Sequence, residues 1–174
     1  IGDRNTVNGV YVYDYVTGTS TNPSLPRCIS FSSGCTSNSV SNVEGFNVAA
    51  GVVHSDGTHN TIKNFKFDNS VAGSSEMRNG LYCIEGTVGF TAQQGVIEGC
   101  SQPIVDVGLN STYKDITEID SFSDGIQYPC KNVTFDGIIK YWNDKSQDNG
   151  GFLRTRSGNS GQAVDGVVIQ NCDI

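Results

Sequence analysis

The stretch NTIKNFKFDNS, residues 60–70, alternates apolar and polar side chains with the period of two that a half-buried β-strand requires. Its opening, an Asn followed within two residues by Val or Ile and then by apolar alternation, recurs along the chain. Clear copies are NTVNGVYVYDYV from Asn5 and NSVSNVEGFNV from Asn38. Weaker copies begin at Gln93, Lys114, Lys131 and Gln162, so that the starts lie roughly 20 to 33 residues apart.

A second short strand follows the first in most copies and is usually introduced by Gly. Each repeat therefore contains at least two strands with a bend between them, and such a unit buries its apolar side only by stacking on its neighbours. Repeats of this length without helical periodicity predict an all-β fold, a right-handed parallel β-helix of about seven turns. The second strands begin at Gly51, Gly80, Pro103, Gly125 and Gly151.

The domain organisation follows from the same repeats. We expect residues 1–174 to form a single segment of the coil. Both ends of the sequence stop inside strand-like patterns, and the first residues have no signal-peptide pattern. We therefore expect the natural polypeptide to continue at one end or both.

Composition and charge narrow the classes of function. The formal net charge is −7 and no Lys/Arg cluster is present, which disfavours nucleic acid and anionic membranes as partners. No apolar window of about 18 residues predicts a transmembrane helix. The six cysteines form no CxxC pair, so we expect no zinc site. Their even number allows a disulfide framework, although free thiols inside the coil are the favoured interpretation.

Alignment of the second strands on their leading Gly or Pro predicts columns of side chains about 4.8 Å apart. The second and fourth positions after that residue are mostly apolar or small, and we expect them to face inward. The third and fifth positions are rich in polar groups, and we expect them to face outward, because successive side chains of a strand point to opposite faces. The outward columns are His54, Cys83, Asp106, Tyr128 and Arg154, and Asp56, Glu85, Gly108, Cys130 and Arg156.

Three carboxyl groups of these columns are the predicted catalytic residues. Glycoside hydrolysis needs one carboxyl group to protonate the leaving oxygen and a second to activate water or to attack. Glu85 and Asp106 are expected roughly 8 Å apart, which suits an inverting pair with Glu85 as the acid and Asp106 as the base. Asp56 and Glu85, at about 5 Å, form the alternative, retaining pair. Glu118 and Asp120, which alternate on a first strand and are expected to face outward, are the next candidates.

Further side chains of the expected outward face suit sugar binding. Arg154 and Arg156 can hold an acidic sugar or hydroxyl groups through their planar guanidinium groups. Trp142 can stack on a sugar ring or hold the following loop in place. A solvated surface, as in any soluble solenoid, explains the same polar columns without a site. The predicted substrate-binding residues are His54, Tyr82, Tyr128, Trp142, Arg154 and Arg156.

The repeats resemble the pectin-lyase-like superfamily, which includes polygalacturonases, pectate lyases and phage tailspike depolymerases. The segment from Gly151 to Ile174 is similar to a polygalacturonase stretch in which a basic Arg-x-Lys pair, here Arg154 and Arg156, precedes a Gly-rich turn. Residues 123–125, Ser-Asp-Gly, are similar to the first catalytic carboxylate motif of that family. The paired Asp motif and the Gly-His-Gly motif are absent, so polygalacturonase activity is not implied.

Resemblance to the tailspike branch implies a glycoside hydrolase that acts on bacterial surface polysaccharide. It also implies a homotrimer located outside the cell or on the tail of a virion. The alternatives are a non-catalytic adhesin, a structural shaft of a viral spike, or a polysaccharide lyase. The absence of a metal-ligand cluster makes a calcium-dependent lyase less favoured. We expect no cofactor, no nucleic-acid partner and no membrane insertion.

Overall fold

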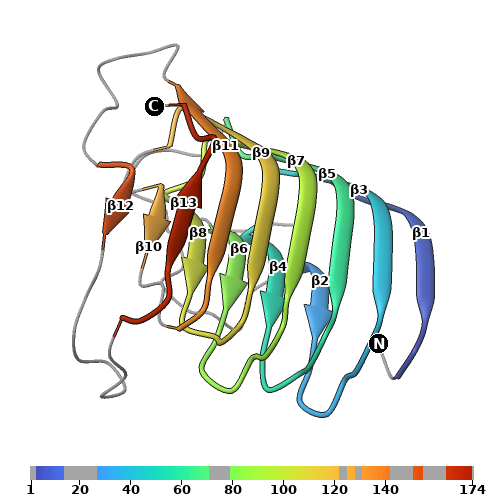
Figure 1. The fold of residues 1–174 in the computed structure, drawn as a ribbon. Coiled ribbons are helices and arrows are strands. Elements are labelled where there is room, and N and C mark those ends of the chain that lie inside the picture. Colours follow the sequence, from blue (N-terminus) through green and yellow to red (C-terminus); the bar gives the residue numbers. More distant parts are fainter. Residues whose placement is uncertain are drawn as a thin grey trace.

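The computed structural model describes residues 3–13, 27–70, 79–121, 125–127, 131–141, 151–154 and 164–173. Strands β1 to β13 lie in these ranges and no helix does, so the all-β expectation is confirmed for the described residues. None of these residues forms a helix that is long and apolar enough to cross a membrane. The strands alternate along the chain between two sheets, and neighbouring strands of each sheet are parallel (Figure 1). This arrangement is compatible with the expected parallel β-helix.

The larger sheet has seven strands in the order β1-β3-β5-β7-β9-β11-β13. The repeat starts at Asn5, Asn38 and Asn60 each lie one residue before a strand, so the asparagine pattern located three strands correctly. The strands are β1 (Thr6–Tyr13), β3 (Ser39–Phe46), β5 (Thr61–Asp68), β7 (Thr91–Glu98), β9 (Thr112–Ile119), β11 (Thr134–Tyr141) and β13 (Val168–Gln170).

The smaller sheet has six strands in the order β12-β10-β8-β6-β4-β2. Val53, Tyr82, Val105 and Gln127 are in register, as the alignment on the leading Gly or Pro predicts. The last strand differs by one residue, because Gln127 pairs with Arg154. The strands are β2 (Arg27–Phe31), β4 (Ala50–His54), β6 (Asn79–Cys83), β8 (Gln102–Asp106), β10 (Ile126–Gln127) and β12 (Leu153–Arg154).

Each long strand of the seven-stranded sheet has a residue with positive φ at its fourth position, and Asn171 directly follows β13. This residue interrupts the alternation of faces. In β3, for example, neither Ser41 nor Asn42 is buried, and Val43 then returns to the interior. The left-handed column consists of Gly9, Asn42, Asn64, Gln94, Asp115, Gly137 and Asn171.

The interior between the two sheets is apolar, and an asparagine ladder crosses part of it. The Asn5 amide donates to Asn38 Oδ1 at 2.9 Å, and the Asn38 amide donates to Asn60 Oδ1 at 2.9 Å. The Asn38 side-chain amide also donates to Asn60 Oδ1, at 2.8 Å. The Asn that opens each of the three clear copies therefore lies in a ladder in which Asn38 and Asn60 each accept from the backbone amide of the preceding copy. The largest buried side chains are Tyr113, Phe31, Phe67, Phe90 and Phe135.

Five cysteines of the described ranges carry no disulfide bond, and Cys130 lies outside those ranges. Cys35, Cys83 and Cys100 are buried among the core residues, where a thiol packs as a small apolar group. The free cysteines are Cys28, Cys35, Cys83, Cys100 and Cys172.

Candidate functional site

His54 does not lie on the outward face, and the expected orientation is wrong for this residue. Its side chain is buried, with the ring 5.4 Å from Phe31 and 5.2 Å from Phe90 between ring centroids. Nε2 accepts from the Asn60 side-chain amide at 2.9 Å, and Nδ1 donates to Thr87 Oγ1 at 3.0 Å, because the Thr87 hydroxyl donates to the His54 carbonyl oxygen. Burial lowers the pKa of His54 to about 4. His54 is therefore a neutral, fully hydrogen-bonded residue of the core.

Asp106 is also buried, so the expected outward groove shared by Glu85 and Asp106 is wrong. Asp106 Oδ1 accepts from the Gly108 amide at 2.6 Å, and Oδ2 accepts from the Tyr113 hydroxyl at 3.0 Å. Burial raises the pKa of this carboxyl group. The error has a physical cause: β4 and most of β8 are buried on both faces, and such strands do not show in their pattern which face is inside.

The two other predicted catalytic carboxylates remain at the surface. Asp56 and Glu85 are exposed and follow β4 and β6, in the segments that lead to the larger sheet. The Asp56 carboxylate lies against Gly86, so these two segments are neighbours. Glu118 is buried, contrary to the expected outward orientation, whereas Asp120 follows β9 and is partly exposed.

The predicted sugar-binding residues that lie in the described ranges, His54, Tyr82 and Arg154, do not form a common site. Tyr82 is half-buried on β6, beside Val53 and Val105. Arg154 is exposed on β12 and pairs with Gln127, whereas the sequence alignment placed it in the column of Tyr128. A change of register by one residue moves a side chain to the other face of the sheet. Tyr128, Trp142 and Arg156 lie outside the described residues.

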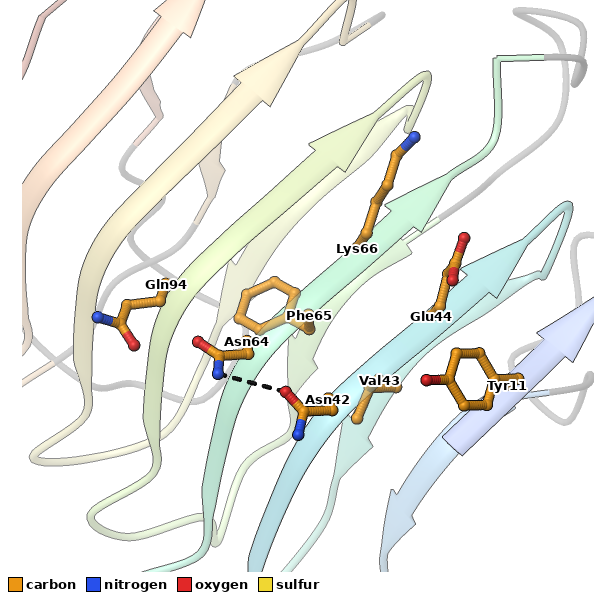
Figure 2. A pocket seen from close by; sticks show the side chains of 8 residues that line it. All are labelled: Tyr11, Asn42, Val43, Glu44, Asn64, Phe65, Lys66 and Gln94. Carbon is orange, nitrogen blue, oxygen red and sulfur yellow. Dashed lines mark hydrogen bonds between the residues drawn. The ribbon is translucent and has the colours of Figure 1, made fainter. Parts of the chain in front are cut away.

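A hollow of about 430 Å³ lies instead on the outer face of the seven-stranded sheet (Figure 2). It spans β1, β3, β5 and β7, at the place where the left-handed column bends these strands. Amide side chains from three adjacent strands and the ring of Tyr11 surround it. The lining residues are Tyr11, Asn42, Val43, Glu44, Asn64, Phe65, Lys66 and Gln94.

Aromatic side chains are exposed beside the hollow. Tyr11 is 61% exposed and Tyr13 is 52% exposed, both on β1. The Tyr13 ring lies 6.5 Å from that of Phe46 between centroids, and its hydroxyl is hydrogen-bonded to Glu44. Loss of hydration and this bond raise the pKa of Tyr13. Exposed rings with a polar edge are suited to stacking on the apolar face of a ligand.

Two carboxyl groups with different proton affinities stand at the ends of two strands of this face, and Lys66, which lines the hollow, contacts one of them, Asp68. Asp68 and Glu98 are in register at the ends of β5 and β7, directly after the buried residues Phe67 and Ile97, so both face outward. Asp68 Oδ2 lies 3.1 Å from Lys66 Nζ, and Oδ1 accepts from the Ser70 hydroxyl at 2.7 Å.

The environments of these two groups move their pKa values in opposite directions. Burial alone would raise the pKa of Asp68, but the hydrogen bonds from Ser70 and the ion pair with Lys66 hold it below its ordinary value. Burial and the negative charge of Asp68 raise the pKa of Glu98. A pair of this kind can divide the roles of nucleophile or base and of acid. In the described part of the chain, no group of three His, Cys, Asp or Glu side chains is arranged to hold a metal ion.

The sequence carried a weak signal for this face. In NTIKNFKFDNS the charged residues Lys63, Lys66 and Asp68 interrupt the apolar positions, and VIEG at residues 96–99 ends in a carboxylate at the equivalent point. No protein family, curated protein or solved structure matches the chain.

Proposed function

We propose that the protein is a right-handed parallel β-helix that binds a polysaccharide on the outer face of its seven-stranded sheet. We further propose that it hydrolyses a glycosidic bond there, with Asp68 and Glu98 as the catalytic pair. The observation that carries this proposal is the in-register pair itself, whose pKa values are moved in opposite directions. In its most specific form, the proposal is a tailspike-type glycoside hydrolase that acts on bacterial surface polysaccharide, as the resemblance of the repeats implies.

Two features of the fold support a β-helix. Consecutive strands alternate between the sheets, and every step within a sheet is parallel. Connections between parallel strands of one sheet are right-handed in nearly all proteins, which supports a right-handed coil. Stacked turns present equivalent outward positions in rows, and a linear polymer can lie across such rows.

Several side chains support a sugar as the ligand. Tyr11 and Tyr13 offer exposed rings for stacking, and Asn42, Asn64 and Gln94 offer amide donors and acceptors for hydroxyl groups. The hollow combines the apolar side chains of Val43 and Phe65 with polar groups that can fix the orientation of a ligand. Tyr11 lies on the first strand of the hollow and Gln94 on the last, so a bound chain would cross several strands.

The chemistry follows from the carboxyl pair. Adjacent strands lie about 4.8 Å apart, close to the separation of about 5 Å in retaining glycosidases. The ionised Asp68 attacks the anomeric carbon while the glycosidic C–O bond breaks, and Glu98 gives its proton to the departing oxygen. The Glu98 carboxylate then takes a proton from water, whose oxygen displaces Asp68 and restores the acid.

Reducing-sugar release from a panel of capsular and O-antigen polysaccharides tests the proposal. Glu98→Gln and Asp68→Asn should each lower kcat by at least about a hundred-fold while leaving the fold intact. Glu85→Gln and Asp136→Asn are matched controls, because Glu85 follows β6 of the smaller sheet, Asp136 lies on β11, and neither belongs to the pair. Full activity in both Asp68→Asn and Glu98→Gln would contradict the catalytic assignment. A loss of activity only in Glu85→Gln would instead favour Glu85 as the catalytic acid, as expected from the sequence.

A non-catalytic binder is the second candidate, and one observation favours it. Both oxygens of Asp68 already have partners, because Ser70 bonds Oδ1 and Lys66 lies at Oδ2. An adhesin would keep this ion pair as part of its binding surface. In that case polysaccharide binds, no reducing ends are released, and Tyr11→Ala weakens the binding.

The proposed assembly is a homotrimer on a virion or outside the cell. Ile139 and Tyr141 on β11 are each 43% exposed, and Val168 on β13 is 44% exposed, so the last strands carry apolar surface that a partner can cover. Sedimentation of the full-length protein as a monomer would contradict the trimer.

A further inference from the structure

The amides of the left-handed column form an ordered row beside the hollow. The Asn42 side-chain amide donates to Asn8 Oδ1 at 2.5 Å, and the Asn64 amide donates to Asn42 Oδ1 at 3.3 Å (Figure 2). The bond between Asn64 and Asn42 orients the Asn64 side chain. Its amino group faces β3, and its carbonyl oxygen therefore faces β7. The next residue of the column is Gln94 on β7, and no hydrogen bond joins it to Asn64 in the part of the chain that the structure describes. The row is interrupted at the hollow.

Gln94 is the unusual member of its column. It has a φ of 57°, in the left-handed region that glycine tolerates best and that asparagine and aspartate tolerate next. The other members are glycine, asparagine or aspartate without exception: Gly9, Asn42, Asn64, Asp115, Gly137 and Asn171. Glutamine has no such preference, and no hydrogen bond of its side chain within the described residues compensates for the conformation. A residue type that tolerates this conformation poorly, at a position where the other strands use Gly, Asn or Asp, motivates a functional hypothesis for Gln94.

We propose that Gln94 is a specificity-determining residue of the hollow and that, together with Asn64, it binds one hydroxyl group of a neutral sugar. This inference rests on the proposed polysaccharide-binding function. The hydroxyl donates its proton to Asn64 Oδ1 and accepts a hydrogen bond from Gln94 Nε2, which completes the row of amides once the Gln94 amide has turned about its last bond from the orientation in Figure 2. A hydroxyl group is suited to this position because it is a donor and an acceptor at once.

The surroundings favour a neutral sugar over a uronic acid. A carboxylate in this position would face the lone pairs of Asn64 Oδ1, and it would share the hollow with the negative charge of Glu44. The nearby pair Asp68 and Glu98 adds further negative charge on the same face when ionised, and Lys66 is already bound to Asp68. Val43 and Phe65 contribute apolar surface to the hollow, against which the C–H face of a sugar ring can lie.

The test compares Gln94→Gly with Asn132→Gly. Each change removes an exposed amide side chain from a left-handed residue, but Asn132 bonds to Asn110, at 3.0 Å, away from the hollow. Affinities are measured by calorimetry for neutral cello-, manno- and galacto-oligosaccharides and for oligogalacturonate. We expect Gln94→Gly to weaken neutral-sugar binding roughly three- to ten-fold, the effect of one lost hydrogen bond, and to keep a melting temperature at least equal to that of the wild type. Asn132→Gly should leave the affinity unchanged.

The outcomes separate this inference from the function on which it rests. Unchanged affinity in Gln94→Gly, together with weaker binding in Tyr11→Ala, would overturn the role of Gln94 and leave the polysaccharide site in place. Preference of the wild type for oligogalacturonate would overturn the neutral-sugar assignment. Binding of none of these probes by the wild type would overturn both the inference and the proposed function. A lower melting temperature in Gln94→Gly would show that the fold requires the glutamine and would also overturn the inference.

Discussion

Glu118 and Lys140 lie in register on the adjacent strands β9 and β11, and both side chains are buried in the interior. Lys140 Nζ donates to the Gly151 carbonyl oxygen at 3.0 Å, whereas neither Glu118 oxygen has a hydrogen-bond partner among the described residues. Burial raises the pKa of Glu118 to about 8, and the charge of Lys140 only partly opposes this effect. Glu118 is therefore mostly protonated at neutral pH.

Stability should fall with rising pH because of Glu118. Its pKa is raised from the ordinary 4.5 to about 8, so its contribution is fully present below pH 4.5 and is lost as pH rises toward 8. The loss in free energy of unfolding is at most about 5 kcal/mol. Denaturant unfolding at pH 5 and pH 8 should show that Glu118→Gln removes this fall. The exposed Glu85→Gln should keep it, and an equal slope in both variants would contradict the prediction.

The dependence on pH from His54 should have the opposite sign. Its pKa is lowered from 6.5 to about 4, so the unfolded chain binds a proton first, and stability is lost as pH falls from 6.5 toward 4. The loss is about 3 kcal/mol. The effects of His54 and Glu118 oppose each other between pH 4.5 and 6.5. His54→Gln should therefore expose the fall due to Glu118 alone in unfolding curves, whereas His59→Asn, at an exposed histidine, should not.

If the proposed hydrolase is correct, Lys66→Met should move both limbs of the pH–rate profile to higher pH. The reaction needs Asp68 ionised and Glu98 protonated, so the rate is limited by Asp68 at low pH and by Glu98 at high pH. The charge of Lys66 lowers the pKa of both groups, and its removal raises both. The profile of kcat/KM against pH checks this, with Lys63→Met on the exposed part of the same strand as the control. Unmoved limbs would contradict the assigned pair.

The asparagine ladder should contribute measurably to stability. Asn38→Ala removes the acceptor of the Asn5 amide and one donor to Asn60 Oδ1. Loss of these bonds, of which the one to Asn60 is buried and the one from Asn5 is partly buried, should lower the free energy of unfolding by about 1–3 kcal/mol. Asn8→Ala, at an exposed amide, should cost less than about 0.5 kcal/mol in the same denaturant titration. Equal losses would mean that the interior position of the ladder has no special effect.

The sequence was informative about register and much less so about orientation. The asparagine repeat located β1, β3 and β5, and the leading Gly or Pro aligned β4, β6, β8 and β10. The slip at β12 has a simple cause, because the residue that aligns with Gly125 is Phe152 and not a glycine. A glycine in the sequence indicates a bend, but it does not fix the register of the strand that follows.

The left-handed column explains why the candidate site was missed. Strict alternation from the buried Ile62 would place Asp68 inside, but the left-handed Asn64 shifts the phase by one residue, and Asp68 faces outward. The same shift at Gln94 turns Glu98 outward. At Asp115 it turns Glu118 inward, contrary to expectation. Nothing in a single sequence marks a glutamine as left-handed.

The asparagine ladder also has a direction, and this limits how the two sheets can be lengthened. Asn38 presents an acceptor to Asn5 and donors to Asn60, so a duplicated repeat carrying Asn38 can be inserted beside it with the same bonds on both sides. Asn60 ends the series, because its amide donates to His54 and to the Cys35 carbonyl oxygen. Beyond it the next two residues of the row are Phe90 and Ser111. Tandem duplication of a whole repeat therefore keeps the side-chain hydrogen bonds of the ladder on one side of Asn60 only, and an engineer who wishes to extend the molecule should copy the repeat that carries Asn38.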